Sequence, residues 1–125
     1  MSGDTYGRLD GNTSAGNADI FVVKYNSSGT KQWTKQLGTS SNDYAYGVAT
    51  DSSGNVYVTG YTNGRLDGNT SAGWEDLFVV KYNSSGTKQW TKQLGTSSGD
   101  EARGVATYSS GNVYETVNTN WRTGW

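Results

Sequence analysis

The stretch Tyr44–Tyr61, YAYGVATDSSGNVYVTGY, decides the fold of this chain. Its two halves, Gly47–Asp51 and Val56–Tyr61, alternate in residue type with a period of two, which is the spacing of side chains along a β-strand. The residues Ser52–Asn55 between them, SSGN, favour a tight turn. The sequence therefore predicts a β-hairpin. Alternation places three small residues on one side of its first strand: Ala45, Gly47 and Ala49.

The same stretch returns at Glu101–Asn118, EARGVATYSSGNVYETVN, at an offset of 57 residues. Residues 1–57 and 58–114 align without a gap, and 46 of these 57 positions are identical, so two residues 57 positions apart are called repeat partners below. A repeat of this length predicts stacked copies of one small supersecondary unit. We interpret 1–125 as a single domain with two repeats, 1–57 and 58–114, and a divergent tail, 115–125.

Two more strands are predicted in each repeat. Asp19–Tyr25 (DIFVVKY) and Lys31–Leu37 (KQWTKQL) are rich in β-branched and aromatic residues, and NSSGT between them is typical of a turn. Segments rich in Gly, Asn, Ser and Thr are predicted to be loops: Met1–Ala18, Gly38–Asp43 and Thr62–Glu75. Each repeat thus supplies a four-stranded antiparallel unit, with no helix longer than one turn.

An all-β fold follows, and a four-stranded unit repeated in tandem is typical of a β-propeller blade. We expect two 57-residue blades per chain. In this arrangement the tight turns gather at one end of the blades and the long loops at the other.

The composition argues against several classes of function. The formal net charge is −1, which gives no electrostatic footprint for nucleic acid, and no apolar run is long enough to span a membrane. Histidine and cysteine are absent, so the commonest general base and the thiolate metal ligands are missing. We therefore expect no enzyme activity, no cofactor, no nucleic-acid partner and no membrane partner. So polar a chain is also compatible with disorder, but its regular β-pattern argues against it.

The segments GVATDSSGNVYVTGYT and DIFVVKYNSSGTKQWTKQLGTSS resemble the bacterial SBBP β-propeller repeat. The first of them, over GVATDSSGNVYVT, is also similar to the NHL propeller repeat. The resemblance covers nearly all of the chain up to Tyr114, and it implies a propeller scaffold from a secreted or cell-surface bacterial protein. It implies nothing about a ligand, and the chain departs from the pattern after Tyr114.

Weak candidates for calcium ligands are the two copies of DGNT, with Asp10, Asn12, Asp67 and Asn69. Asp19 and Asp76 would add a carboxylate. The spacing does not match the twelve-residue EF-hand loop, and turn formation by the Asp and Asn side chains explains the motif as well. Asp51, in DSSGN, is interpreted as a turn cap, because its repeat partner is Tyr108.

The two copies differ at eleven positions, and five of these lie in or just after the predicted long loops. Variation on one end of a common scaffold is typical of a binding surface, while drift in unconstrained loops explains it equally well. Trp74, a loop residue whose repeat partner is Asn17, is the main candidate for ligand contact. The predicted glycan or protein site comprises Trp74, Glu75, Glu101, Arg103, Tyr44 and Tyr46. Trp33 and Trp90, at equal positions in their repeats, are interpreted as packing between blades rather than as sugar platforms.

The chain is also predicted to assemble with itself. Asp19–Leu37 has no predicted strand before it, and Arg103–Asn118 has none after it, so these halves are expected to join between chains. Only Tyr44–Leu94 supplies all four strands in order. The expected interface residues are Asp19, Phe21, Val23, Tyr25, Val113, Tyr114, Glu115 and Thr116. Closed rings of two-blade chains favour a homotrimer, then a homotetramer. A purely structural assembly unit without a ligand is the alternative function.

Overall fold

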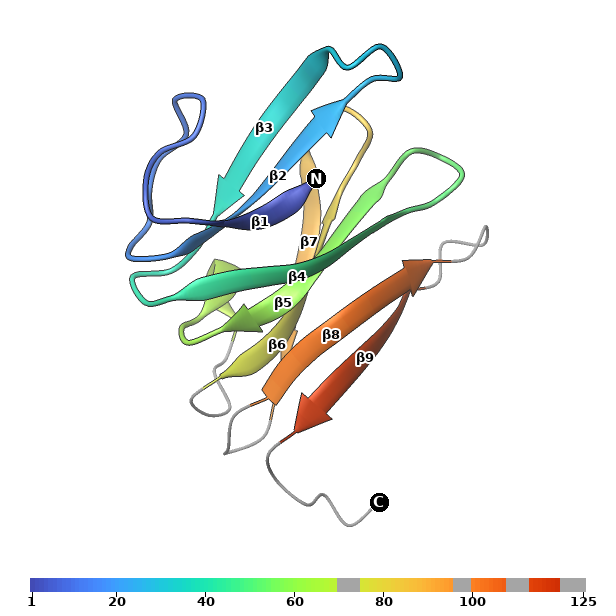
Figure 1. The fold of residues 1–125 in the computed structure, drawn as a ribbon. Helices are drawn as coiled ribbons and strands as arrows, with labels where there is room; N and C mark the ends of the chain where they lie inside the picture. Colours follow the sequence, from blue (N-terminus) through green and yellow to red (C-terminus); the bar gives the residue numbers. More distant parts are fainter. Residues whose placement is uncertain (70–74, 96–99, 108–112, 120–125) are drawn as a thin grey trace.

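The computed structural model describes residues 1–69 and 75–95 in full, and only the backbone of residues 100–107 and 113–119. Within these segments the chain is all β apart from one 3-10 turn, η1, at Leu66–Gly68. The prediction of an all-β fold is therefore confirmed. The strands form three antiparallel sheets, and the first two are stacked face to face (Figure 1).

The middle sheet is the complete unit that the sequence predicts for one repeat. It pairs β4 (Asp43–Thr50), β5 (Val56–Thr62), β6 (Asp76–Tyr82) and β7 (Lys88–Leu94) in chain order. Two boundaries extend into segments predicted to be loop, because β4 begins at Asp43 and β5 ends at Thr62. Asp43 and Thr62 pair with each other and so extend the hairpin at its open end.

The N-terminal sheet holds an unexpected strand. It pairs β1 (Ser2–Thr5), β2 (Asp19–Tyr25) and β3 (Lys31–Leu37) in chain order. The prediction that Met1–Ala18 is loop, with no strand before Asp19, is therefore wrong at β1. Ser, Gly and Asp are poor strand formers, and it is pairing with β2 that makes this segment extended. Ser2 lies opposite Val22, as its repeat partner Thr59 lies opposite Val79.

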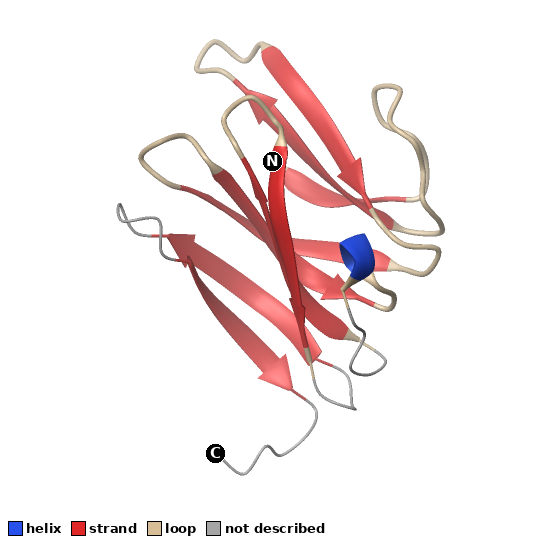
Figure 2. Ribbon diagram, turned by 180° about the vertical axis from the view of Figure 1, so that it is seen from behind, coloured by secondary structure: helices blue, strands red, loops and turns tan. Residues whose placement is uncertain are grey.

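A third sheet contains only β8 (Asp100–Thr107) and β9 (Val113–Thr119), the repeat of the hairpin β4–β5. Strand β8 lies against β4 and β5 of the middle sheet, which Figures 1 and 2 show from opposite sides.

A β-bulge interrupts β4 at Tyr46. Ala45 lies opposite Gly60, but Gly47 lies opposite the preceding residue, Thr59. The extra residue reverses the alternation of side chains. The prediction that Ala45, Gly47 and Ala49 share one side is therefore wrong for Ala45. Strand β8 carries the same irregularity at Arg103.

The hydrophobic core lies between the N-terminal and middle sheets. Ile20 and Val22 of β2 pack there against Val58, Phe78 and Val80, all of which are buried. Leu66 of η1 is also fully buried in this cluster, so the loop between β5 and β6 is part of the core. None of the described helical segments is long and apolar enough to cross a membrane.

Trp33 of β3 joins the two sheets. Its ring centroid lies 6.0 Å from that of Tyr82 in β6, and its indole N–H donates to the carbonyl of Ser84 at 3.1 Å. Packing between repeats is thus confirmed for Trp33. Its repeat partner Trp90 contacts Tyr57 of its own sheet, with 6.1 Å between the ring centroids.

Candidate functional site

The long-loop end of the sheets is fixed by two fully buried aspartates, Asp19 and Asp43. Asp19 accepts hydrogen bonds from the backbone N–H of Ala15 at 2.6 Å and from the Gln36 amide at 3.0 Å. Asp43 accepts from the backbone N–H of Thr39 at 2.6 Å and from the Thr62 hydroxyl. Burial raises the pKa of Asp43. These bonds tie the long loops to the sheets and so give this end a defined shape.

The polar side chains of the DGNT loops bond to other groups of the same chain. Asp10 forms an ion pair with Lys31 at 2.8 Å, and the hydrogen bond from Lys31 lowers the Asp10 pKa. The Asn12 amide donates to the carbonyls of Leu9 and Thr34, at 2.8 and 3.1 Å. The second copy repeats the arrangement, with Asp67 paired to Lys88 at 2.8 Å and the Asn69 amide bonded to two carbonyls. This arrangement favours the structural explanation of DGNT over the calcium hypothesis.

Asp51 caps the turn between β4 and β5, as the sequence predicts. One carboxylate oxygen accepts from the backbone N–H groups of Ser53 and Asn55, both at 3.0 Å. The other accepts from the Asn55 amide and the Tyr57 hydroxyl, also at 3.0 Å. These bonds, led by the one from the Asn55 side chain, lower the pKa of Asp51. The carboxylate therefore serves the turn rather than a ligand.

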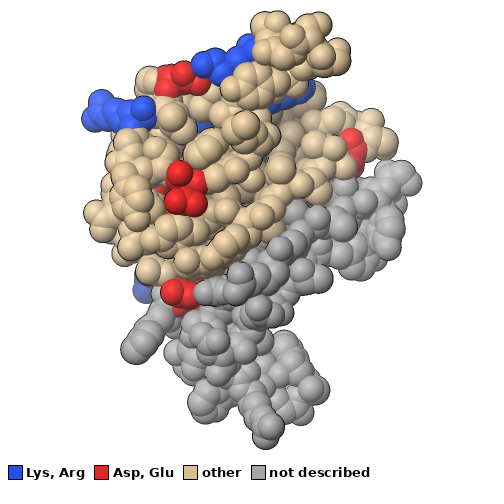
Figure 3. Space-filling model, in the orientation of Figure 1, with Lys and Arg blue, Asp and Glu red and all other residues tan. Residues whose placement is uncertain are grey.

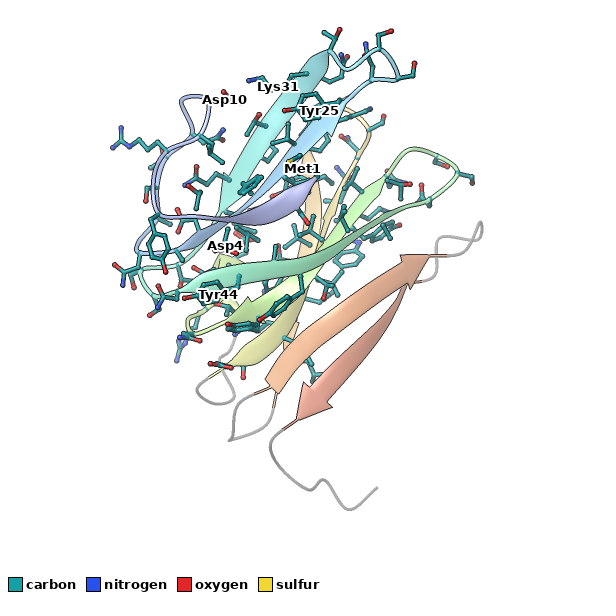
Figure 4. The ribbon with its side chains drawn as sticks, viewed as in Figure 1. Met1, Asp4, Asp10, Tyr25, Lys31 and Tyr44 are labelled. Atoms are coloured by element: carbon teal, nitrogen blue, oxygen red, sulfur yellow. The ribbon has the colours of Figure 1, made fainter. Side chains whose placement is uncertain are left out.

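Two of the predicted ligand residues come together in a cluster of aromatic rings, the tyrosine cluster, formed by Tyr44, Tyr46 and Tyr61. The Tyr61 ring lies 4.9 Å from that of Tyr44 and 5.3 Å from that of Tyr46, measured between centroids. The bulge places Tyr46 beside Tyr61, and Tyr46 remains 46% exposed. Figure 4 shows Tyr44 near the long-loop end of β4.

The cluster has a defined electrostatic setting. Burial, followed by the hydrogen bond with Tyr46, raises the pKa of Tyr61 far above its ordinary value. The hydrogen bond with Tyr6 is the main cause that raises the pKa of Tyr44, and Glu75 contributes to both shifts. The hydroxyls of Tyr44 and Tyr61 are therefore neutral over the physiological range, where each can donate and accept a hydrogen bond.

Glu75 is the third predicted ligand residue in the described part of the chain, and it precedes Asp76, which lies opposite Thr62, the neighbour of Tyr61. Trp74 lies outside the described residues. Glu101 and Arg103 belong to β8, of which only the backbone is described, and β8 lies against β4 and β5. The sequence did not single out Tyr61, the central ring, because it was assigned only to a strand face. Its repeat partners, Asp4 and Asn118, both differ from it, and this difference was a signal that could have identified it.

The predicted interface residues of β2 have unequal surroundings. The Asp19 side chain is fully buried by groups of its own chain, and its place in an interface between chains stays a prediction. Val23 is 8% exposed and its backbone is bonded to Met1, whereas Tyr25 is 48% exposed. Phe21 is half-buried. Val113, Tyr114, Glu115 and Thr116 lie in β9, whose side chains are outside the described residues.

The described residues contain no candidate metal centre. No group of three or more His, Cys, Asp or Glu side chains is placed to hold a metal ion in that part of the chain. Figure 3 shows charges of both signs scattered over the described part of one face, with acidic and basic groups side by side at the top of the view.

The family model described as "Beta-propeller repeat", SBBP, matches residues 32–67 and 89–120, which is more than half of the chain. The chain therefore belongs to the SBBP β-propeller repeat family, as the resemblance of its motifs implied.

Two curated proteins are similar to it. One is "Regulatory protein FlaEY" from Caulobacter vibrioides, which is 32% identical over 114 residues, covering 85% of this chain and 12% of the relative. The other is "Uncharacterized WD repeat-containing protein L264" from Acanthamoeba polyphaga mimivirus, which is 30% identical over 121 residues, covering 83% of this chain and 9% of the relative. The chain spans about a tenth of the length of these relatives. The names of both relatives, a regulatory and a repeat protein, are consistent with a non-enzymatic repeat module.

Proposed function

We propose that the chain is a non-enzymatic propeller module that binds a glycan or a protein at its long-loop end. The tyrosine cluster is the observation that carries this proposal. Three adjacent rings offer apolar faces for stacking and hydroxyls for hydrogen bonding, a combination that suits sugars and the polar surfaces of proteins. The rings are held on strands rather than on a free loop, so little conformational entropy is lost on binding.

The positions that differ between the repeats complete this proposed surface. The repeat partners of Tyr44 and Tyr46 are Glu101 and Arg103. Both belong to β8, which packs against β4. Trp74 immediately precedes Glu75, which affects the pKa of two of the tyrosines. A ligand that contacts the cluster would therefore meet residues that no other part of the repeat supplies.

A glycan array probed with the purified chain tests this function, followed by titration calorimetry on any glycan that binds. We expect Tyr46→Ala and Trp74→Ala each to weaken binding at least about tenfold, as removal of a central aromatic contact does. Val48→Ala is the matched control, because Val48 is 39% exposed on the same strand but nearer the tight turn. Equal binding by all three variants would move the site elsewhere.

A second candidate function is a structural unit that assembles with itself and needs no ligand. A hollow of about 390 Å³ favours it, lined by Met1, Lys24 and Tyr25 on one side and by Val48 and Val56 on the other. In the middle sheet, Val56–Val58 fill the equivalent position beside β6. We propose that β9 of another copy enters this hollow and pairs with β2, where Val113 would lie opposite Tyr25.

Strand β1 occupies part of the edge of β2 with which β9 would pair. Ser2–Thr5 pairs with Asp19–Val22, in the register that Thr116–Thr119 would use. In the proposed assembly β9, with seven residues, replaces β1, with four. Each junction then forms a composite four-stranded blade, and a closed ring of three or four chains results.

Native mass spectrometry over a range of concentrations tests the assembly. Three copies of the 13.4 kDa chain would give a species of about 40 kDa, which we favour over four. A chain that remains monomeric while it binds glycans would support recognition and exclude the structural unit. Assembly with a blank array would support the reverse.

A further inference from the structure

We propose that one chain binds a second copy through two specific sheet faces, in the geometry by which the two sheets pack within a single chain. The first is the outer face of the N-terminal sheet. The second is the face of β6–β7 that points away from the core. The inference rests on the proposed self-assembly, and it adds which residues meet and how.

The outer face of the N-terminal sheet lacks a cover that its repeat partner has. It contains a hollow of about 340 Å³ lined by Leu9, Phe21, Val23, Tyr25 and nearby polar residues. The repeat partners of these four residues are Leu66, Phe78, Val80 and Tyr82, which form the core with Ile20 and Val22. Tyr25 is 48% exposed where Tyr82 is 4% exposed. The same apolar surface is thus fully covered in one sheet and partly open, chiefly at Tyr25, in the other.

The face that would cover it is also present. In the core, the cover is supplied by the inward side of β2–β3, with Ile20, Val22, Trp33 and Leu37. The repeat partners of these residues are Leu77, Val79, Trp90 and Leu94, on the side of β6–β7 that points away from the core. Leu77 and Val79 are already buried in the single chain, so this face is open only along β7, where Leu94 is 68% exposed; Leu37 is partly buried against the core. The open hollow and its complement therefore both lie on this chain.

The contact within the chain serves as a template for the contact between chains. The Trp33 ring lies 6.0 Å from the Tyr82 ring, and two donors, the Trp33 indole and the Lys24 ammonium, bind the Ser84 carbonyl at 3.1 and 2.9 Å. The repeat partners predict the intermolecular set. Trp90 of one copy packs on Tyr25 of the next, and Trp90 and Lys81 donate to the carbonyl of Ser27.

The turn that carries Ser27 is already shaped for this role. Asn26 accepts hydrogen bonds from Ser28 and Thr30 at 3.0 and 2.9 Å, and Asn83 accepts from Ser85 and Thr87 at the same two distances. The two turns are thus built alike, and the acceptor needs no rearrangement. Figure 4 shows Tyr25 and Lys31 at the same end of the N-terminal sheet.

The two faces differ from each other, so the contact is head-to-tail. A head-to-tail contact repeats until it closes into a ring or grows into a filament. A second copy is preferred to an unrelated protein as the occupant, because the chain already buries this same pair of faces against each other.

Cross-linking of cysteine variants tests the proposal, since the chain has no cysteine of its own. The variant Ser27→Cys/Lys81→Cys places thiols at the predicted intermolecular contact. The matched control, Lys24→Cys/Ser84→Cys, places them at the template contact inside one chain. With a short bis-maleimide, the first variant should give covalent multimers, and the control should give a cross-linked monomer.

Each outcome decides a different point, because native mass spectrometry is run on the same samples. If Ser27→Cys/Lys81→Cys stays monomeric on a denaturing gel although the native chain is oligomeric and the control reacts, this interface is wrong and self-assembly stands. If the native chain is monomeric at all concentrations, both the interface and the assembly are wrong.

A second variant keeps the test independent of cysteine chemistry. Tyr25→Ala should weaken assembly at least about tenfold while the midpoint of urea unfolding changes little, because Tyr25 is 48% exposed in the single chain. Tyr6→Ala is the control for loss of an exposed aromatic, since Tyr6 is 71% exposed and lies outside both faces. Equal weakening by the two variants would overturn the proposed contact.

Discussion

At the scale of single residues, Asp51 has the most clearly defined role. Its carboxylate bonds two backbone N–H groups and two side chains, and its pKa is lowered in the folded chain. Because the ordinary pKa of 3.8 applies to the unfolded chain, this carboxylate stabilises the fold above that pH. The stabilisation is lost as the pH falls through the lower, folded-state pKa.

We therefore predict that Asp51→Ala lowers the midpoint of urea unfolding at pH 7. The difference between the variant and the parent should shrink below about pH 4, where Asp51 binds a proton in the unfolded parent before it does so in the folded parent. Asp4→Ala is a suitable control, because Asp4 is an exposed strand residue away from this turn. A difference that is constant down to pH 2 would contradict the proposed cap.

A second residue-scale prediction concerns Gly47. It lies opposite the fully buried Thr59, on a strand that packs against β8. A large side chain there should overpack the site, and Gly47→Leu should lower the free energy of unfolding by roughly 1–3 kcal/mol. Gly7→Leu is the control, because an added Cβ at Gly7 meets nothing within 4 Å. Equal stability of the two variants in urea titrations would show that Gly47 has room around it.

At the scale of elements, β1 covers the edge of β2 that does not pair with β3. It is short and contains Gly and Asp, which are unfavourable in strands. Its backbone nevertheless pairs along Asp19–Val22, and Met1 bonds to Val23. An intermolecular strand at this edge would have to compete with these bonds.

We predict that deleting Met1–Thr5 strengthens self-assembly at least about tenfold, because the competing strand is removed and the edge of β2 is left unpaired. Analytical ultracentrifugation over a concentration series measures the change. Replacing Ser2–Thr5 by a flexible segment of equal length is the control for chain length, and it should act like the deletion. Weaker assembly in both variants would show that β1 remains in place in the oligomer.

The strands show which parts of the fold could be predicted from the periodicity of the sequence. Val56–Thr62 and Asp19–Tyr25 were predictable because their own residues favour extended structure. Strand β1 was not predictable in this way, since it depends on a partner distant in sequence. The bulge at Tyr46 was missed for a related reason: only the pairing partner on β5 shows that β4 has one residue too many.

The candidate site was predictable only in part. Comparison of the repeats singled out Tyr44, Tyr46 and Glu75, because a substitution between nearly identical copies is visible in one sequence. That Tyr61 lies between two of these residues required the pairing of β4 with β5. The sequence could not decide the role of the DGNT loops, because a carboxylate beside glycine and asparagine suits a calcium site and a turn equally well. The ion pair between Asp10 and Lys31, which the structure shows, favours the turn.

At the scale of the whole molecule, the complete middle sheet lies between a three-stranded and a two-stranded sheet. We predict that deleting the residues after Ser98 abolishes assembly, because it removes β8 and β9, the hairpin proposed to join the next copy. The truncated chain should still fold, since the described buried residues of the core between the first two sheets all lie between Ile20 and Tyr82.

Native mass spectrometry of the truncated and intact chains, in the same buffer, measures this effect. Circular dichroism of the truncated chain is the control for its folding. A truncated chain that still forms oligomers would show that the two proposed contact faces suffice without the hairpin.

The shared register of β1 and β5 has a consequence for how such a protein changes its size. Because Ser2 and Thr59 occupy the same place in their sheets, a cut at this point of the repeat leaves both sides of the junction alike. Duplication or loss of one 57-residue unit in the gene would then add or remove a blade without creating a new kind of contact. Selection could vary the number of blades freely, while the contacts between neighbours stay under a single set of constraints.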